Sequence, residues 1–359
     1  MEIISSTEIE VVSFAFRAEN YFLENHQQIP LFEQYRSFKN EFRNSGGRKV
    51  NVNIYSVDRA QVYFEGQDSI LIKEGAINAE FSVGTGVSRL ENCNCLINAY
   101  ENSFAQYRFN DVIFSMQLGM YNFHHFLLEV FPVIWLYRED FRGKTFVISS
   151  SGDSRFVEEI FRFFEIDIKV ELIPLRAKCH ISNAMLLSHL PNRIYPVELL
   201  KEIRDFAFRK IASRLENSKL VENPTIFLGR GDSSRNRRHL LNEDELISYL
   251  KINLGSVEVV RPAMVDFRNL TLSLNNATTV IGVTGGALAN ILWARKMGEF
   301  IELVPQNYPG STESEELSKI FDFKYTKILT SQVQENEFFA NSNQVFIPPR
   351  IPLRRLLDS

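Results

Sequence analysis

Two side chains that could move a proton lie in the segment 122–129, where His125 and Glu129 are four residues apart. Residues at this spacing share one face of a helix. A histidine that a carboxylate orients is a suitable general base. Phe123 and Phe126 leave a second interpretation open, in which this is a core helix and the histidine is a hydrogen-bonded core residue. A metal site is less favoured, because no third ligand follows at a suitable spacing.

Gly285 and Gly286 form a candidate phosphate-binding turn directly after the apolar run 279–284. The turn opens into an apolar segment with helical spacing, so it would present backbone N–H groups and the positive end of a helix dipole to an anion. Glycine also lets an anion approach the backbone closely. A strand-to-helix connection that uses glycine only for packing is an equally good interpretation. The patterns G-x-G-x-x-G and G-x-x-x-x-G-K-[ST] are both missing, so neither a dinucleotide-binding fold nor a P-loop is supported.

Charged side chains at the ends of other predicted strands could complete such a site. Arg230 ends one strand, and Arg238 lies in the basic loop that follows it. Ligands of open parallel sheets bind at the carboxyl ends of the strands, so we expect both arginines to face the same crevice as Gly285 and to bind a diphosphate. For Arg238 a solvated basic loop is an equally good interpretation. Glu302 could accept hydrogen bonds from the two hydroxyls of a ribose, or it could be a glutamate at the edge of the core.

The elements that must position these residues alternate, from residue 224 onward, between short β-branched or aromatic runs and amphipathic segments of helix length. This pattern is typical of a parallel sheet with helices on its faces. Upstream, further strands are expected around a helix, and the first part of the chain is richer in strand patterns. The expected strands are 144–151, 169–174, 225–230, 257–262, 279–284, 299–305 and 325–330, and the expected helices of the C-terminal half are 242–252, 265–277, 286–296 and 313–323.

The segment 195–217 has apolar residues at helical spacing and is long enough to bridge two domains. We therefore expect two α/β domains, an N-terminal one over 1–217 with extra β-strands and a C-terminal one over 218–335. Residues 336–359 are expected to pack back over the domains as a tail. Three arginines in this tail would also allow contact with an anionic membrane surface.

The overall composition argues against several classes of protein. A formal charge of -4 and a pI near 6.0 supply no basic field, so we expect no nucleic acid partner. The N-terminus has no basic segment followed by an apolar stretch, and no apolar run reaches the length of about 18 residues that a membrane-spanning helix needs. Three cysteines are too few for a disulfide framework. A cytoplasmic protein is therefore expected.

Three blocks of this sequence, taken in order, resemble glycosyltransferase family 61. N-F-H-H-F-L-L-E (122–129) is similar to the family's N-Y-x-H-W-x-x-E/D. F-L-G-R (227–230) with R-H-L-L-N-E (238–243) resembles its arginine strand and its R-x-x-x-N-E helix start. G-V-T-G-G-A-L-A-N (282–290) with F-I-E-L-V-P (300–305) resembles its G-x-H-G-A-x-L-x-N with I-E-x-x-P.

The resemblance covers about residues 110–305 and departs from the family's pattern at Thr284, where the third block normally carries a histidine. Threonine donates a hydrogen bond but cannot carry the charge of an imidazole. This departure favours an alternative in which the chain is a non-catalytic nucleotide-binding or glycan-binding module. A nucleotide-sugar epimerase or hydrolase on the same fold is a further alternative.

What the resemblance implies is a GT-B fold, with two Rossmann-like domains that face a cleft, and inverting transfer of a hexose or pentose from a nucleotide sugar, commonly a UDP-sugar. The acceptor would be a glycan or a lipid-linked glycan of capsule or lipopolysaccharide synthesis, used at the inner face of the membrane. The N-terminal domain would bind the acceptor, with His125 or Glu129 as the base. The residues implied for the donor are Arg230, Arg238, Thr284, Gly285, Gly286, Asn290 and Glu302.

No metal and no other cofactor is expected. The sequence has no D-x-D triplet, the acidic pair that positions a divalent metal on the diphosphate in the other large transferase fold. The charge of the leaving group must then be stabilised by Arg230, by Arg238 and by the backbone at Gly285 and Gly286.

Overall fold

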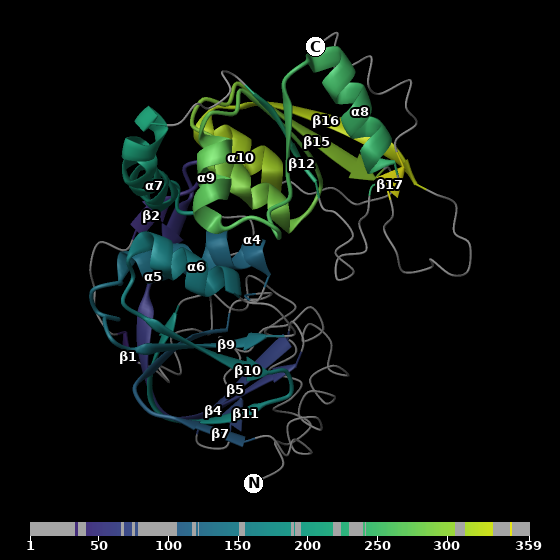
Figure 1. Cartoon of the computed structure of the whole chain (residues 1–359). Helices are drawn as coiled ribbons and strands as arrows, with labels where there is room; N and C mark the ends of the chain where they lie inside the picture. The colour runs from purple at the N-terminus through teal and green to yellow at the C-terminus, as the bar shows by residue number, and fades with distance from the viewer. Residues whose placement is uncertain are drawn as a thin grey trace. The chain divides into compact units, whose positions relative to one another are not determined.

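The chain forms two compact units, Met1–Pro196 and Val197–Ser359, and each combines a sheet with helices (Figure 1). The α/β class expected from the sequence is thereby confirmed. The structure is a computed structural model that describes residues 33–34, 41–65, 68–73, 76–77, 106–116, 120, 122–150, 155–187, 190, 195–217, 224–229, 240, 242–305, 313–332 and 345–346.

The division between the units lies at the start of α7 (Val197–Asn217), the segment that the sequence indicates as a bridge. The expected boundary lies at the other end of this helix, after residue 217. The structure groups α7 with the second unit, because the helix packs against α9 (Phe267–Asn275) and the 3₁₀ helix η2 (Gly286–Trp293).

The described part of the first unit contains a nine-stranded sheet, whose main path is β10-β9-β8-β11-β4-β5-β6 with β1 beside β4 and β7 beside β11. Strands β8, β9 and β10 are parallel to one another, whereas β4 is antiparallel to each of its neighbours β11, β5 and β1. The expected strands 144–151 and 169–174 are therefore confirmed as β9 and β10. The bounds are β1 Glu33–Gln34, β4 Ile54–Glu65, β5 Asp68–Lys73, β6 Ala76–Ile77, β7 Gln106–Phe109, β8 Val112–Ser115, β9 Thr145–Ser150, β10 Lys169–Pro174 and β11 Lys178–Leu187, with a separate antiparallel pair β2 (Glu41–Arg43) and β3 (Lys49–Asn51).

Three consecutive helical pieces follow β8 and lead to β9: α4 (Phe123–His125), the π-helix η1 (Phe126–Val130) and α5 (Phe131–Leu136). Pro132 gives a reason for the π-turn, because proline has no backbone N–H and its ring clashes with the carbonyl four residues earlier in a regular α-helix. A wider π-turn before Pro132 accommodates both the missing N–H and the bulk of the ring. Such π-turns occur frequently at functional sites.

Two features hold this helical segment in place. Asn122 caps its start, since Oδ1 of Asn122 accepts a hydrogen bond of 3.0 Å from the backbone N–H of His124. Aromatic rings bury its apolar side against α6 (Arg155–Phe164) and β9. The rings in mutual contact are Phe123, Phe126, Phe131, Trp135, Phe146, Phe156, Phe161 and Phe164.

The described part of the second unit contains a six-stranded sheet in the order β13-β12-β14-β15-β16-β17. Five strands are parallel, and β17 (Val345–Phe346), which falls in the expected tail, is antiparallel to β16. Counted along the chain, the parallel strands follow the doubly wound order 2-1-3-4-5, which has its switch point between β12 and β14. The bounds are β12 Thr225–Leu228, β13 Val257–Val260, β14 Thr279–Val283, β15 Glu299–Pro305 and β16 Lys324–Gln332, so all five expected strands are confirmed.

Helices cover both faces of this sheet. The crossovers from β12 to β13 and from β13 to β14 run in opposite directions, and right-handed crossovers then place α8 (Glu243–Leu254) and α9 on opposite faces, as Figure 1 shows. On the second face α9, η2, α10 (Glu313–Phe321) and α7 pack together. The expected helix over 286–296 is a 3₁₀ helix over Gly286–Trp293. Within the described ranges, no helix is long and apolar enough to span a bilayer.

Candidate functional site

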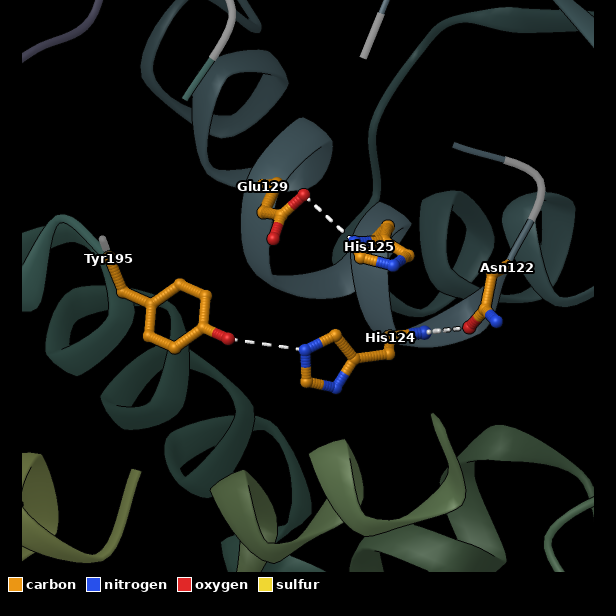
Figure 2. Close-up of polar contacts among 5 residues, drawn as sticks. All are labelled: Asn122, His124, His125, Glu129 and Tyr195. Carbon is orange, nitrogen blue, oxygen red and sulfur yellow. Dashed lines mark hydrogen bonds and ion pairs between the residues drawn. The ribbon is translucent and has the colours of Figure 1, made fainter. Parts of the chain in front are cut away.

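His125 and Glu129 form a close pair at the start of the helical segment after β8. Nδ1 of His125 lies 2.9 Å from Oε2 of Glu129 (Figure 2). The side chain of Glu129 is 0% exposed, whereas that of His125 is 22% exposed. The carboxylate therefore fixes the ring through Nδ1 and leaves Nε2 as the nitrogen that can take up a proton. The shared helical face expected from the sequence is confirmed, and the arrangement suits a general base with a buried orienting carboxylate.

A second buried contact lies beside this pair, between His124 and Tyr195. Nε2 of His124 is 3.1 Å from the hydroxyl oxygen of Tyr195, as Figure 2 shows. Both residues are buried. Sequence reasoning missed them, although the His-His doublet is a visible signal. Tyr195 carries no such signal, because it reaches the site from a segment 71 residues away.

The predicted phosphate turn lies at the carboxyl end of β14, beside the switch point of the second sheet. Gly285 has φ 145° and ψ 178°, a conformation that L-residues with a side chain rarely adopt. A Cβ on Gly282 would lie 2.5 Å from Cδ2 of Leu288, so η2 packs directly on β14. In the first turn of η2 the N–H of Leu288 donates a 2.9 Å hydrogen bond to the carbonyl of Gly285, whereas the N–H groups of Gly286 and Ala287 have no earlier carbonyl in the same helix as acceptor. The turn can therefore offer backbone donors to an anion.

Thr284 and Glu302 lie beneath this turn and are both 0% exposed. The hydroxyl of Tyr325 donates a 2.7 Å hydrogen bond to Oε2 of Glu302. Burial raises the pKa of Glu302, while the nearby hydroxyls of Thr284, Tyr325 and Ser314 oppose the increase. These residues form one buried group that joins β14, β15, β16 and α10. The contact between Glu302 and a ribose stays a prediction, and in this structure its carboxyl group faces these hydroxyls.

Asn290 is buried within η2 and helps to hold its first turn. Nδ2 of Asn290 donates a 2.9 Å hydrogen bond to the carbonyl of Ala287. Oδ1 has no hydrogen-bond partner among the described residues and is buried. The contact between Asn290 and a donor stays a prediction.

Arg230 and Arg238 lie outside the described residues, but Gly229, which directly precedes Arg230, is the first residue after β12. A Cβ on Gly229 would lie 2.9 Å from Oε1 of Glu243, at the start of α8. The same carboxylate accepts a 3.0 Å hydrogen bond from Arg261, which follows β13 directly. Arg261 is a cation at the carboxyl edge that sequence reasoning missed. The signal that selected Arg230, an arginine directly after a strand, would also have found it.

No group of three or more His, Cys, Asp and Glu side chains that could hold a metal ion occurs in the part of the chain that the structure describes.

Comparison with known proteins gives one family. The family described as Glycosyltransferase 61 matches residues 123–301, a range that contains His125, Glu129 and the Gly285 turn. No curated protein matches the chain. Among solved structures, the chain is similar to the heptosyltransferase TibC, an iron-containing dodecamer in complex with ADP-D-beta-D-heptose. The TM-score is 0.31 at 11% sequence identity, over 91% of this chain and 90% of that one.

Proposed function

We propose that this chain, a glycosyltransferase whose residues 123–301 belong to glycosyltransferase family 61, moves a sugar from a nucleotide donor to a glycan hydroxyl. The proposed transfer is one inverting displacement. The observation that carries this mechanism is the His125–Glu129 pair, in which the imidazole is partly exposed and the carboxylate is covered.

In the proposed step, Nε2 of His125 takes the proton of the acceptor hydroxyl as its oxygen attacks the anomeric carbon. The bond from that carbon to the diphosphate oxygen breaks, and the nucleoside diphosphate leaves with the bonding electrons. Glu129 holds the proton on Nδ1 and stabilises the imidazolium that forms. The burial of Glu129 favours His125 as the base, because a side chain that is 0% exposed does not reach an acceptor.

The proposed donor site lies at the switch point between β12 and β14, since doubly wound sheets bind ligands outside the carboxyl ends of their strands at that point. There the backbone of Gly285 and Gly286, together with Arg230 and Arg238, would stabilise the departing diphosphate without a metal. Arg261 adds a further cation at the same edge. The burial of Thr284 supports catalysis over a binding module, because its difference from the family's histidine changes the interior beneath the turn and not its surface.

We further propose that the two units form a GT-B arrangement, the first binding the acceptor and the second the donor. The donor is proposed to be a UDP-sugar, and the acceptor a glycan or lipid-linked glycan of capsule or lipopolysaccharide synthesis. The proposed place of action is the cytoplasmic face of the membrane, with the tail 336–359 near the lipid surface.

Thermal unfolding against UDP, GDP, CMP, dTDP and their sugars, each with EDTA and with magnesium, tests the donor site. A nucleotide at about 100 times its dissociation constant adds about 2.7 kcal/mol to the free energy of unfolding. We expect one nucleotide to raise the unfolding midpoint equally with and without metal. No shift with any nucleotide would contradict the donor site, and a shift seen only with magnesium would contradict metal independence.

A further inference from the structure

The contact between His124 and Tyr195 takes no part in the proposed proton transfer, yet both of its side chains are buried. His124 is 6% exposed and Tyr195 is 1% exposed. Burying an imidazole and a phenol hydroxyl costs free energy unless they find partners, and the 3.1 Å contact supplies one for each. Tyr195 comes from the last residues of the first unit, just before α7 begins.

The ring of His124 also touches the proposed base. The ring centroids of His124 and His125 lie 5.3 Å apart at an interplanar angle of 80°, which is an edge-to-face contact. His124 is itself held at two points, through its backbone N–H by Asn122 and through Nε2 by Tyr195. His125 is therefore held through Nδ1 by Glu129, and the ring of His124, which is itself fixed at two points, packs against it.

We propose that Tyr195 is a positioning residue of the active site, which fixes the ring of His124 so that this ring in turn keeps His125 in one orientation. The proposal rests on the proposed function of His125 as the base. A partly exposed imidazole can turn about its χ2 bond, which exchanges Nδ1 for a ring carbon and removes the hydrogen bond to Glu129. Geometry matters for the rate, because a misplacement of about 1 Å can cost about 10²-fold.

If the contact between Tyr195 and His124 served core packing alone, removal of the Tyr195 hydroxyl would leave the orientation of the His125 ring unchanged. If the contact positions His125, removal of the hydroxyl changes which ring nitrogen of His125 carries the proton. With Nδ1 facing Glu129, the neutral ring carries its proton on Nδ1; a ring that turns away loses this preference and populates both tautomers.

The test is ¹⁵N NMR of histidine-labelled protein above the pH range of imidazole titration, which reads the tautomer of each ring. The variants are Tyr195→Phe, which removes only the hydroxyl, and His124→Phe, which keeps a ring but removes the other partner. Tyr137→Phe is the matched control. Its hydroxyl donates a hydrogen bond of equal length, 3.1 Å, to the carbonyl of Val52, and Tyr137 is likewise buried and caps the far end of the same helical segment.

We expect wild type and Tyr137→Phe to show a single Nδ1–H tautomer for His125, and both Tyr195→Phe and His124→Phe to show a mixture. A single tautomer in either of these two variants would overturn the proposal, and so would a mixture in Tyr137→Phe. The readout needs neither donor nor acceptor. Loss of the proposed transferase activity and loss of the positioning role can therefore be told apart.

Discussion

The proposed chemistry depends on which ring nitrogen of His125 carries the proton. Glu129 accepts from Nδ1 at 2.9 Å, so Nε2 keeps the lone pair that a base needs. This dependence separates the roles of the two residues. His125 would touch the acceptor, and Glu129 would act only through the ring.

Glu129→Gln tests this division of roles. A glutamine amide can donate to Nδ1 and thereby favour the tautomer with its proton on Nε2, which cannot accept another there. We expect turnover to fall by about 10²–10⁴-fold, the usual contribution of a general base, while the nucleotide-induced shift in the unfolding midpoint is retained. Glu139→Gln, at an exposed ion pair with Arg142, is the control. Near wild-type turnover in Glu129→Gln would remove Glu129 from the mechanism.

Glu302→Gln tests the buried group beneath the Gly285 turn. Burial raises the pKa of Glu302, so the folded protein retains a proton at pH values where the unfolded chain has lost it. Wild-type stability should therefore fall as pH rises from about 4.5 towards the folded-state pKa. We expect the unfolding midpoint of the variant, relative to wild type, to rise through this window and then to level off.

Thermal unfolding from pH 4.5 upward measures this difference, with Glu299→Gln on the same strand as the control. A constant difference between Glu302→Gln and wild type would show that Glu302 does not titrate as inferred.

The sequence predicted those residue contacts that are local and missed those that are not. The i, i+4 spacing was enough to pair His125 with Glu129. Nothing local indicates that Tyr325 bonds to Glu302, because that contact depends on β16 lying beside β15. The sequence therefore left Glu302 open between a ribose contact and a glutamate at the edge of the core, and the structure places it in the interior.

At the scale of elements, the turn from β14 into η2 depends on Gly285. We expect Gly285→Ala to destabilise the protein by about 1–3 kcal/mol, because an alanine would be strained at φ 145°. The nucleotide-induced shift in the unfolding midpoint should be lost as well.

Gly298→Ala is the matched control, since a Cβ there would meet nothing closer than the carbonyl of Thr278 at 3.9 Å. Urea unfolding measures both variants, and equal stability of Gly285→Ala and Gly298→Ala would contradict the inferred strain.

The hydrophobic pattern predicted all five parallel strands of the second unit but not their order. Pattern reports which faces are buried, whereas the order 2-1-3-4-5 depends on which strands pair. The pattern also does not distinguish the kind of helix over 286–296, because an apolar run such as Leu288–Trp293 suits a buried 3₁₀ helix as well as an α-helix.

At the scale of the whole molecule, the boundary between the units is testable with fragments. Nη2 of Arg204 on α7 donates a 2.6 Å hydrogen bond to the carbonyl of Ala294 at the end of η2, and its guanidinium lies 4.4 Å from the centroid of the Phe321 ring. A fragment of residues 197–359 should therefore unfold at a higher temperature than one of residues 218–359. Circular dichroism during heating measures both fragments. Equal midpoints would instead favour the boundary expected from the sequence.

If His125 is the base of this glycosyltransferase, its removal must slow sugar transfer. The substrate for this measurement is a sugar derivative of the nucleotide that raises the unfolding midpoint, with simple glycosides as acceptors. Mass spectrometry and NMR would follow product and anomeric configuration for wild type, His125→Ala and the control His180→Ala on β11. We expect an inverted product, a rate lower by about 10²–10⁴-fold in His125→Ala alone, and an unchanged nucleotide-induced shift in the unfolding midpoint. Transfer by His125→Ala at the wild-type rate, or a product with retained configuration, would contradict the proposed mechanism.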